Sequence, residues 1–312
     1  MIRIGVVNID VSHPMAFSQY LMKENRARYV AVYNEGFRGD DEVESFISKF
    51  NLEKRCSSIE ELADSVDVGF IQGCNWNKHI ENARPFIEKG KPVFIDKPIV
   101  GSLADCSIIE DLVAKGAVIL GSSSVRYANE IVEFLAIPEE ERGKIVNIFG
   151  TSGVDEFNYG IHIVEGICGL VGAEAVSSKF VSRAVVDEKV CETFSVNFSN
   201  GVTATYNTFL KVFHPFEVVI MTTKTTYQFR IDTGKIYGAL LDRICDYMEK
   251  GENKLADITE LTHAIKIALA ARISRAKGGV EVKLADIPKD DPGFDGYQFA
   301  KEYAAGASKI YL

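Results

Sequence analysis

Short apolar runs alternate with longer amphipathic segments along the first 122 residues of the chain. The apolar runs are long enough for buried strands, and they read IRIGVV, YVAVYN, VDVGFIQG, PVFID and AVILGSS. The segments between them place apolar residues at helical spacing, over residues 14–25, 41–50, 78–89 and 108–116. Continuous apolar strands joined by helices are typical of a parallel sheet with both faces covered. The pattern therefore predicts an α/β domain over residues 1–122.

Beyond Ser122 the pattern changes to strands in which polar and apolar residues alternate. A short helix over 128–136 and a second near His162 accompany these strands, which read KIVNIFGTS, AVSSKFVSRAVV, CETFSVNFSN, VTATYNTFL, FEVVIMTTK and TTYQFRID. Two more helices are expected over 236–250 and 257–277, and the aromatic-rich residues 294–312 are expected to dock on the body or on a neighbour. Alternation with tight turns favours an open, mostly antiparallel sheet. Residues 123–312 therefore predict a second domain of the α+β class.

Composition and charge narrow the classes of function. The chain is 46% hydrophobic and carries a net charge of -9, which is typical of a globular protein and unfavourable for nucleic acid or an anionic membrane surface. Its six cysteines are scattered without a CxxC pair, which indicates reduced thiols and no metal site. No apolar run is long enough to cross a membrane or to form the core of a signal peptide. We therefore expect a cytoplasmic protein.

The turn after the first strand, NIDVSHP, lies where dinucleotide-binding enzymes carry three glycines. Asn8, Asp10 and His13 stand at those positions. Glycines let the backbone approach a pyrophosphate, whereas a carboxylate about 4 Å from a phosphate costs on the order of 4 kcal/mol at an effective dielectric near 20. Two interpretations are open. In the one we favour, Asp10 or Ser12 caps a helix that begins near Pro14, and nearby backbone amides remain free to bind the phosphate. In the other, the phosphate site is lost. Under the first interpretation the cofactor contacts here are Asn8, Ile9, Asp10, Ser12 and His13.

The end of the second strand, VAVYNEGFRG, offers residues of both signs for an adenosine ribose. Dinucleotide folds place an acidic residue here for the 2′-hydroxyl of NAD, or a basic residue for the 2′-phosphate of NADP. Asn34 and Glu35 suit the hydroxyl, and Arg38 suits the phosphate. The choice between NAD and NADP therefore stays open.

Two motifs carry the candidate chemistry. In KPVFIDKPIV a strand ends at Asp96, so Lys97 lies at the carboxyl edge of the parallel sheet, where open α/β folds bind ligands. In NYGIHIVEGICGLVG a helix places His162 and Glu165 on one face, with Asn158 one turn before the histidine. Taken separately, the lysine is as readily a surface residue, and the histidine is more often structural than catalytic. Their combination is more informative.

The order of these motifs resembles the Gfo/Idh/MocA family of sugar and polyol oxidoreductases. The resemblance rests on FIDKP at the fifth strand, NxGxHxxE ahead of GLVG, and the segments SSIEELADSVDVGFIQG, NKHIENARPFIEKGKPVFIDKP and EDLVAKGAVILGSSSVRY. It covers nearly the whole chain. It implies a Rossmann-like first domain, a second domain that binds substrate, and reversible hydride transfer between a hydroxyl group and NAD or NADP.

The resemblance also implies roles for individual residues. Lys97 would hydrogen-bond the reacting hydroxyl and the nicotinamide ribose, and His162 would take or return the hydroxyl proton, with Asn158 beside them. Alcohol oxidation needs a general base, and an ammonium stabilises the developing alkoxide, so the pairing is chemically sensible. The residues implied around the nicotinamide are Cys74, Asn75, Trp76, His79, Asp96, Lys97 and Pro98. Those implied to contact the substrate are Lys97, Arg126, Tyr127, Tyr159 and His162.

Two further stretches, besides the glycine turn, depart from the family pattern. Asn158 stands where many members have an aspartate, and it cannot exchange a proton at neutral pH. Glu165 replaces the usual aspartate after the histidine, and we expect it to orient or cap. The usual Thr-Pro-Asn appears as Cys74-Asn75-Trp76, and we expect Trp76 to pack at a strand end although it has a ring that could stack on a ligand.

Three functions follow as hypotheses. The leading one is an NAD(P)-dependent oxidoreductase that acts on a sugar, sugar derivative or polyol. The second is a redox-neutral lyase, epimerase or glycosidase that oxidises its substrate transiently and retains its cofactor. The third is a ligand sensor that kept the fold without turnover. In each case we expect a homodimer or homotetramer, because the open sheet needs a cover and family members often pair through this face.

Overall fold

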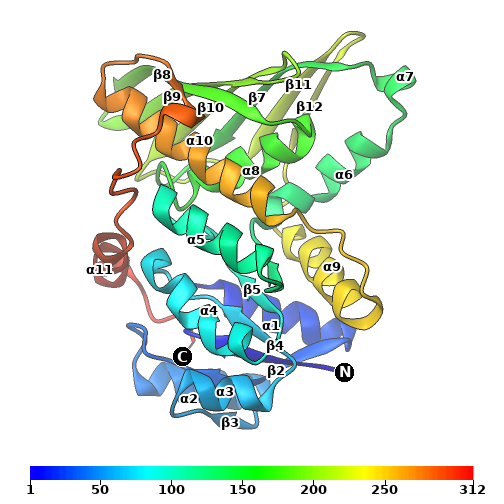
Figure 1. Ribbon diagram of the computed structural model, residues 1–312, viewed down its shortest axis with the longest axis vertical. Helices are drawn as coiled ribbons and strands as arrows, with labels where there is room; N and C mark the ends of the chain where they lie inside the picture. The colour runs from blue at the N-terminus through cyan, green and yellow to red at the C-terminus, as the bar shows by residue number, and fades with distance from the viewer. Residues whose placement is uncertain (312) are drawn as a thin grey trace.

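The first half of the chain forms the predicted six-stranded parallel sheet. In the computed structural model, which describes residues 1–311, its strands lie in the order β3-β2-β1-β4-β5-β6 (Figure 1). The strands are β1 (Ile2–Val7), β2 (Ala27–Tyr33), β3 (Lys54–Arg55), β4 (Val68–Ile71), β5 (Val93–Ile95) and β6 (Ile119–Leu120). The order reverses between β1 and β4, and the crevice at their carboxyl ends is the place where open α/β sheets bind ligands.

Helices connect these strands, three of them close to the predicted ranges 14–25, 41–50 and 78–89, whereas the one predicted over 108–116 begins earlier, at Leu103. They are α1 (His13–Glu24), α2 (Asp40–Phe50), α3 (Ile59–Ser65), η1 (Trp76–Lys78), α4 (His79–Glu88) and α5 (Leu103–Ala114). The serines Ser58 and Ser102 begin α3 and α5 by accepting hydrogen bonds from the backbone N–H groups of Glu61 and Asp105. Helix α3 and strand β3 were not predicted from the sequence, because both are too short to show a period.

The second sheet has seven strands in the order β12-β11-β7-β10-β9-β8-β13. All pairs are antiparallel except β7 with β10, which run parallel. The fold class predicted from the sequence is therefore confirmed, whereas the domain boundary at residue 122 stays a prediction. The strands are β7 (Ile145–Ser152), β8 (Ala175–Val186), β9 (Lys189–Phe198), β10 (Thr203–Leu210), β11 (Glu217–Thr222), β12 (Thr226–Arg230) and β13 (Val282–Lys283).

Helices α8 and α10 pack on one face of this sheet and lie between the two sheets (Figure 1). Gly150 on β7 allows the close approach of α8, since a Cβ there would lie 2.6 Å from Ile163 Cγ1. Helix α10 begins at a capping box in which Asp257 and Glu260 satisfy each other's backbone N–H groups. The helical elements of this half are η2 (Ser124–Tyr127), α6 (Asn129–Ala136), α7 (Glu139–Arg142), α8 (Gly160–Val171), α9 (Ile236–Lys250), α10 (Ile258–Ala276), η3 (Leu284–Asp286) and α11 (Gly296–Gly306).

Both hydrophobic cores contain residues from both halves of the chain. Leu240, Leu241 and Ile244 of α9 join the core that α1 forms with the first sheet. Helix α10 contacts α5 and joins the other core. The aromatic helix α11 also returns to the first half, beside the edge of the parallel sheet (Figure 1). The expectation that residues 294–312 dock on the body is confirmed for 294–311, and Leu312 lies outside the described residues.

Candidate active site and dinucleotide crevice

Lys97 and Asn158 meet where the first sheet faces the second half of the chain. Lys97 follows β5 and Asn158 directly precedes α8, so their positions follow from the ends of those elements. The Lys97 ammonium donates to both oxygens of Asn158, at 2.8 Å to Oδ1 and 3.0 Å to the backbone carbonyl. The Tyr159 ring lies beneath the same ammonium, 5.3 Å from Nζ to the ring centroid. The predicted juxtaposition of Lys97 with Asn158 is therefore present.

His162 lies one turn into α8 and is held by a hydroxyl group. Its Nδ1 is 2.7 Å from Ser123 Oγ, which also accepts a hydrogen bond from the backbone N–H of Val125. Glu165, one turn further along α8, accepts hydrogen bonds from the Ser122 hydroxyl and the Ser123 backbone N–H. Glu165 thus fixes the loop that carries Ser123, and Ser123 in turn orients the His162 ring.

Burial and neighbouring charge set the protonation states of this cluster. Desolvation, reinforced by the nearby Lys97 cation, lowers the pKa of His162 well below its ordinary value, so the ring is neutral at pH 7. Desolvation also lowers the pKa of Lys97, against the attraction of Asp96 and Asp155. For Glu165, desolvation raises the pKa despite its hydrogen bonds. The cluster therefore combines a neutral imidazole with a buried amine.

Asp155 joins the cluster although the sequence analysis did not select it. Its carboxylate accepts hydrogen bonds from the backbone N–H groups of Phe157 and Tyr159, and its other oxygen lies 3.5 Å from Asn158 Nδ2. A carboxylate thus stands behind Asn158, and its charge raises the pKa of Lys97 against desolvation. The signal was its position three residues before Asn158, on the loop that enters α8.

His13 and Tyr237 form the wall of the site nearest β1. His13 Nδ1 lies 2.7 Å from Asp96 Oδ2, and the Tyr237 ring packs edge-on against the His13 ring at 5.3 Å. Desolvation raises the pKa of the buried Asp96 carboxyl, but the His13 imidazole and the Lys97 cation together outweigh it, so the pKa is lowered. Tyr237 on α9 was missed because its sequence neighbourhood shows only an amphipathic helix.

Asp10 occupies the crevice at the carboxyl ends of β1 and β4. Its side chain is 3% exposed, and it accepts hydrogen bonds from the backbone N–H of Phe37 at 3.1 Å and of Cys74 at 3.0 Å. Two glycines make room for it: a Cβ at Gly36 would lie 1.9 Å from Asp10 Oδ1, and one at Gly73 would lie 3.5 Å from Oδ2. Desolvation raises the pKa of this carboxyl, against those N–H bonds.

The expected helix cap at this turn is wrong. Ser12 is the N-cap residue of α1, but its side chain makes no capping hydrogen bond, and the Asp10 carboxylate points to the two neighbouring loops. The physical reason is that the N–H groups of Phe37 and Cys74 converge on Asp10, whereas Pro14 removes one donor from the first turn of α1. Asn8 adopts the left-handed φ of +65° at the first glycine position, and its Oδ1 accepts from the N–H groups of Glu35 and Gly36.

The residues at the end of β2 are divided between structure and cavity. Asn34 accepts from the Ile9 N–H and donates to the Arg38 carbonyl, so its amide is used within the turn. Arg38 is buried, and its guanidinium donates to the Asp10 carbonyl and pairs with Glu42. Glu35 is exposed at a cavity of about 500 Å³. The cavity is lined by Asn8, Asp10, Glu35, Gly36, Phe37, Gly73, Cys74, Asn75, Lys78, Ala300, Lys301 and Ala304.

The loop after β4 is held by buried contacts. Trp76 is 3% exposed, packs on Phe157 and Phe299, and donates from Nε1 to the Phe294 carbonyl, so the packing interpretation is confirmed. His79 is buried between the carbonyls of Gly73 and Ile99, and desolvation lowers its pKa. Cofactor roles for Cys74, Asn75 and Pro98 stay predictions.

Arg126 and Tyr127 are engaged with the second half of the chain. The Arg126 guanidinium pairs with Glu260 of α10, and the Tyr127 hydroxyl accepts from the Ala256 N–H at 2.8 Å. These contacts support the packing of α10 and the segment before it. A substrate role for either residue stays a prediction.

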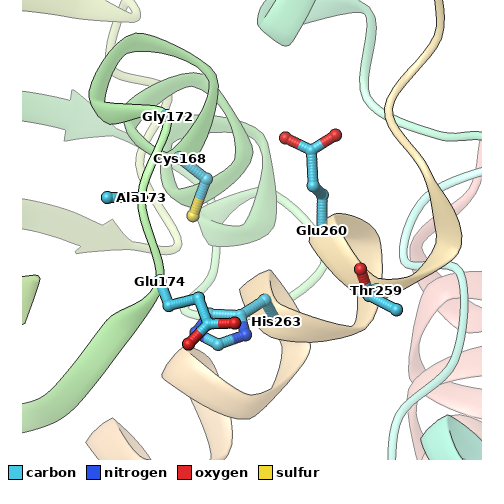
Figure 2. Close-up of a pocket in the computed structure, with 7 residues that line it drawn as sticks. All are labelled: Cys168, Gly172, Ala173, Glu174, Thr259, Glu260 and His263. Carbon is cyan, nitrogen blue, oxygen red and sulfur yellow. The ribbon is translucent and has the colours of Figure 1, made fainter. Parts of the chain in front are cut away.

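A separate cavity of about 230 Å³ lies between the end of α8 and the start of α10. Figure 2 shows the Cys168 sulfur of α8 with the Glu260 carboxylate and the His263 ring, both of α10, around this cavity. Desolvation raises the pKa of the Cys168 thiol to about 12, so it offers no thiolate at neutral pH. Among residues 1–311 no group of three or more His, Cys, Asp or Glu side chains is placed to hold a metal ion, and no helix is long and apolar enough to cross a membrane.

The structure thus joins a Rossmann-type parallel sheet to an open mixed sheet, with Lys97 and Asn158 in contact where the two halves of the chain meet. Residues 2–123 match the model of the Gfo/Idh/MocA family, described as an oxidoreductase family with an NAD-binding Rossmann fold. This match confirms the resemblance for that part of the chain and supports NAD or NADP as the class of cofactor. No curated protein matches the chain.

Solved structures share the fold over most of the chain. A probable dehydrogenase from Thermotoga maritima is 16% identical, with a TM-score of 0.79 over 92% of this chain and 100% of that one. A putative myo-inositol dehydrogenase from Sinorhizobium meliloti 1021 is 15% identical, with a TM-score of 0.79 over 91% and 100%. A myo-inositol dehydrogenase from Lactobacillus casei, solved with NAD(H) and myo-inositol, is 15% identical, with a TM-score of 0.76 over 91% and 96%. At these identities the likeness shows the fold alone.

The donor set of the crevice fits an anionic dinucleotide. The backbone N–H groups of Phe37 and Cys74 converge at the switch point, and both donate to the carboxylate of Asp10. The cavity beside them extends from the end of β1 to Glu35 at the end of β2. The residues present therefore fit the pyrophosphate and adenosine ribose of NAD or NADP when the Asp10 side chain moves away from the N–H groups of Phe37 and Cys74.

Proposed function

We propose that this protein is an NAD(P)-dependent oxidoreductase that transfers a hydride between the nicotinamide and a hydroxyl-bearing carbon of a sugar, sugar derivative or polyol. The observation that carries the proposal is the meeting of Lys97, at the end of β5, with Asn158 and the neutral His162 on α8. The family match and the dehydrogenases with the same fold support the choice of cofactor and of substrate class.

The cofactor supplies the hydride acceptor, and the chain supplies the proton chemistry. The Lys97 ammonium donates two of its three N–H groups to Asn158. Its third N–H would donate to the substrate oxygen and stabilise the developing alkoxide. His162 would take the hydroxyl proton on Nε2, while Nδ1–H donates to Ser123 Oγ. The imidazolium that forms lies near a cation, so it would release the proton to water after each turnover.

The substrate would reach Lys97 beside α11. A cavity of about 260 Å³ lies next to Asn158 and Asp155, and Phe294 and Phe299 line it from the other side. Aromatic side chains at such a cavity suit the apolar face of a sugar or polyol ring, and the carboxylate and amide suit its hydroxyl groups. Arg126 and Tyr127 would act at a distance, through the packing of α10.

A redox-neutral enzyme is the second candidate, and α11 favours it. Ala300, Lys301 and Ala304 of this helix line the same cavity as Asp10 and Glu35. A cofactor bound there would leave slowly, as a reaction requires in which the cofactor is first reduced and then reoxidised on the same substrate. Retention of cofactor through purification would favour this candidate over a simple dehydrogenase.

The test combines cofactor binding with turnover. Calorimetric titration of stripped protein with NAD⁺ and NADP⁺, beside a spectrum of untreated protein, is expected to show micromolar binding of one of them or cofactor already present. A sugar and polyol screen then follows absorbance at 340 nm, with Lys97→Met as the inactive variant and Lys115→Met, whose side chain is 70% exposed, as its control. Absence of binding to both dinucleotides at millimolar concentration would refute the proposal.

A further inference from the structure

Residues 307–311, the tail segment, lie on the turn that would bind the pyrophosphate. The Tyr311 hydroxyl donates to the Val11 carbonyl at 2.6 Å, and its ring packs edge-on against Phe46 of α2 at 5.4 Å. Tyr311 is 1% exposed, so this contact is buried. The tail segment thereby ties one carbonyl of the turn to α2.

Arg38 connects the same turn to the tail segment a second time. Its Nε and Nη2 donate to the Asp10 carbonyl at 3.1 and 2.9 Å, and its Nη1 donates to the Ser308 carbonyl at 2.7 Å. Glu42 pairs with Arg38 and also accepts from the Ile310 N–H. Four of the five N–H groups of the residue best placed to bind a 2′-phosphate are therefore already used within the chain.

These ties fix the conformation of Asp10. With the carbonyls of Asp10 and Val11 both held, the Asp10 side chain is directed between the loops after β2 and β4, where Gly36 leaves it space. There it takes the N–H groups of Phe37 and Cys74, which are the donors that a pyrophosphate at this switch point would use. Two negative groups cannot share these donors without a large electrostatic cost.

We propose that the tail segment locks the turn after β1 in a closed state, in which Asp10 is an internal substitute for the pyrophosphate of the cofactor. Binding of the dinucleotide exchanges Asp10 for the pyrophosphate and releases Tyr311 from Val11. The tail segment is thus an autoinhibitory strap that sets cofactor affinity. The proposal rests on the proposed function only in naming the dinucleotide as the competing anion.

Two variants separate the strap from the anion. Tyr311→Phe keeps the ring on Phe46 and removes the hydrogen bond to Val11, so the Kd for NAD⁺ or NADP⁺ is expected to fall roughly fivefold. Asp10→Asn removes the competing charge, and the Kd is expected to fall at least about tenfold. Tyr297→Phe, at a tyrosine of α11 that is 57% exposed, is the matched control and is expected to leave the Kd unchanged. Calorimetry gives each Kd, and thermal unfolding verifies that each variant is folded.

Hydrogen exchange provides a readout independent of affinity. On addition of NAD⁺ or NADP⁺ to the unaltered protein, the amides of residues 308–311 are expected to exchange faster, because the strap is released. If the dinucleotide binds, but both variants keep the unaltered Kd and residues 308–311 stay protected, the strap is refuted and the proposed function stands. If the unaltered protein and every variant fail to bind either dinucleotide at millimolar concentration, both the proposed function and the exchange at Asp10 are refuted. Binding that appears only in the variants supports the strap and counts against the proposed function of the unaltered protein.

Discussion

Two adjacent serines before η2 provide a direct test of how His162 is held. Ser123 Oγ bonds the Nδ1 atom of His162 at 2.7 Å and the N–H of Val125 at 3.2 Å, and all three residues are buried. The hydroxyl of Ser124 is equally buried but has no hydrogen-bond partner within the described residues. The two positions therefore share a backbone segment and a residue type and differ in what the hydroxyl does.

The expected magnitudes follow from that difference. Ser123→Ala leaves two buried polar groups unpaired, at about 1–3 kcal/mol for each, so the free energy of unfolding is expected to fall by about 2–6 kcal/mol. Ser124→Ala removes a buried hydroxyl that has no partner, so it is expected to be neutral or to stabilise the protein by up to about 1 kcal/mol. Urea unfolding at pH 7, followed by circular dichroism, measures both. Variants that agree within about 0.5 kcal/mol would refute this account of His162.

Three further predictions test the site and the assembly. Lys97→Met keeps a side chain of similar length and removes a buried charge, so the variant is expected to stay folded in thermal unfolding while turnover falls at least about 100-fold; unchanged turnover would remove Lys97 from the mechanism. The pKa of His162 is lowered from 6.5 in the folded state, so below pH 6.5 the unfolded chain binds a proton that the folded chain does not, and stability falls as pH falls. Urea unfolding of the unaltered protein is expected to lose up to about 1.4 kcal/mol per pH unit relative to His162→Gln between pH 6.5 and 5, and parallel curves would contradict this. The second sheet exposes Val146 and Val181 at 50% and 52%, so light scattering at micromolar concentration is expected to give a mass of two or four chains, which Val146→Lys lowers; a single-chain mass throughout would exclude the oligomer.

The sequence predicted the elements whose periodicity was long enough to be read. The continuous apolar runs of β1, β2 and β4, and the alternation from β8 to β12, lead directly to the two sheets. Periodicity says nothing about strand order, so the parallel pairing of β7 with β10 inside an otherwise antiparallel sheet was beyond it. Short elements such as α3 contain too few residues to show a period.

The candidate site was predictable only where a motif marked it. Lys97 was identified because it lies at the end of a strand, where parallel sheets bind ligands, and His162 because it lies on a helix face with Glu165. The structure brings Lys97 and His162 into one cluster. Ser123 and Tyr237 reach the same cluster from η2 and α9 by tertiary packing, which leaves no local trace in the sequence. Asp10 does not cap α1, because its carboxylate accepts hydrogen bonds from two N–H groups on loops 27 and 64 residues away in the sequence. Local capping rules do not consider such distant donors.

The interleaving of the two hydrophobic cores bears on how a ligand enters. Because α9 packs against α1 and α10 packs against α5, rotating the halves apart about a hinge would expose apolar surface on both sides. The chain is therefore expected to melt as one cooperative unit, and a fragment ending near residue 122 would lack part of its own core. Separating the two halves to admit a ligand would therefore be energetically unfavourable. We expect the surface helix α11 and the residues that follow it to move instead when a ligand enters or leaves. The rate of ligand exchange then depends on local opening of this segment and not on the stability of the whole fold.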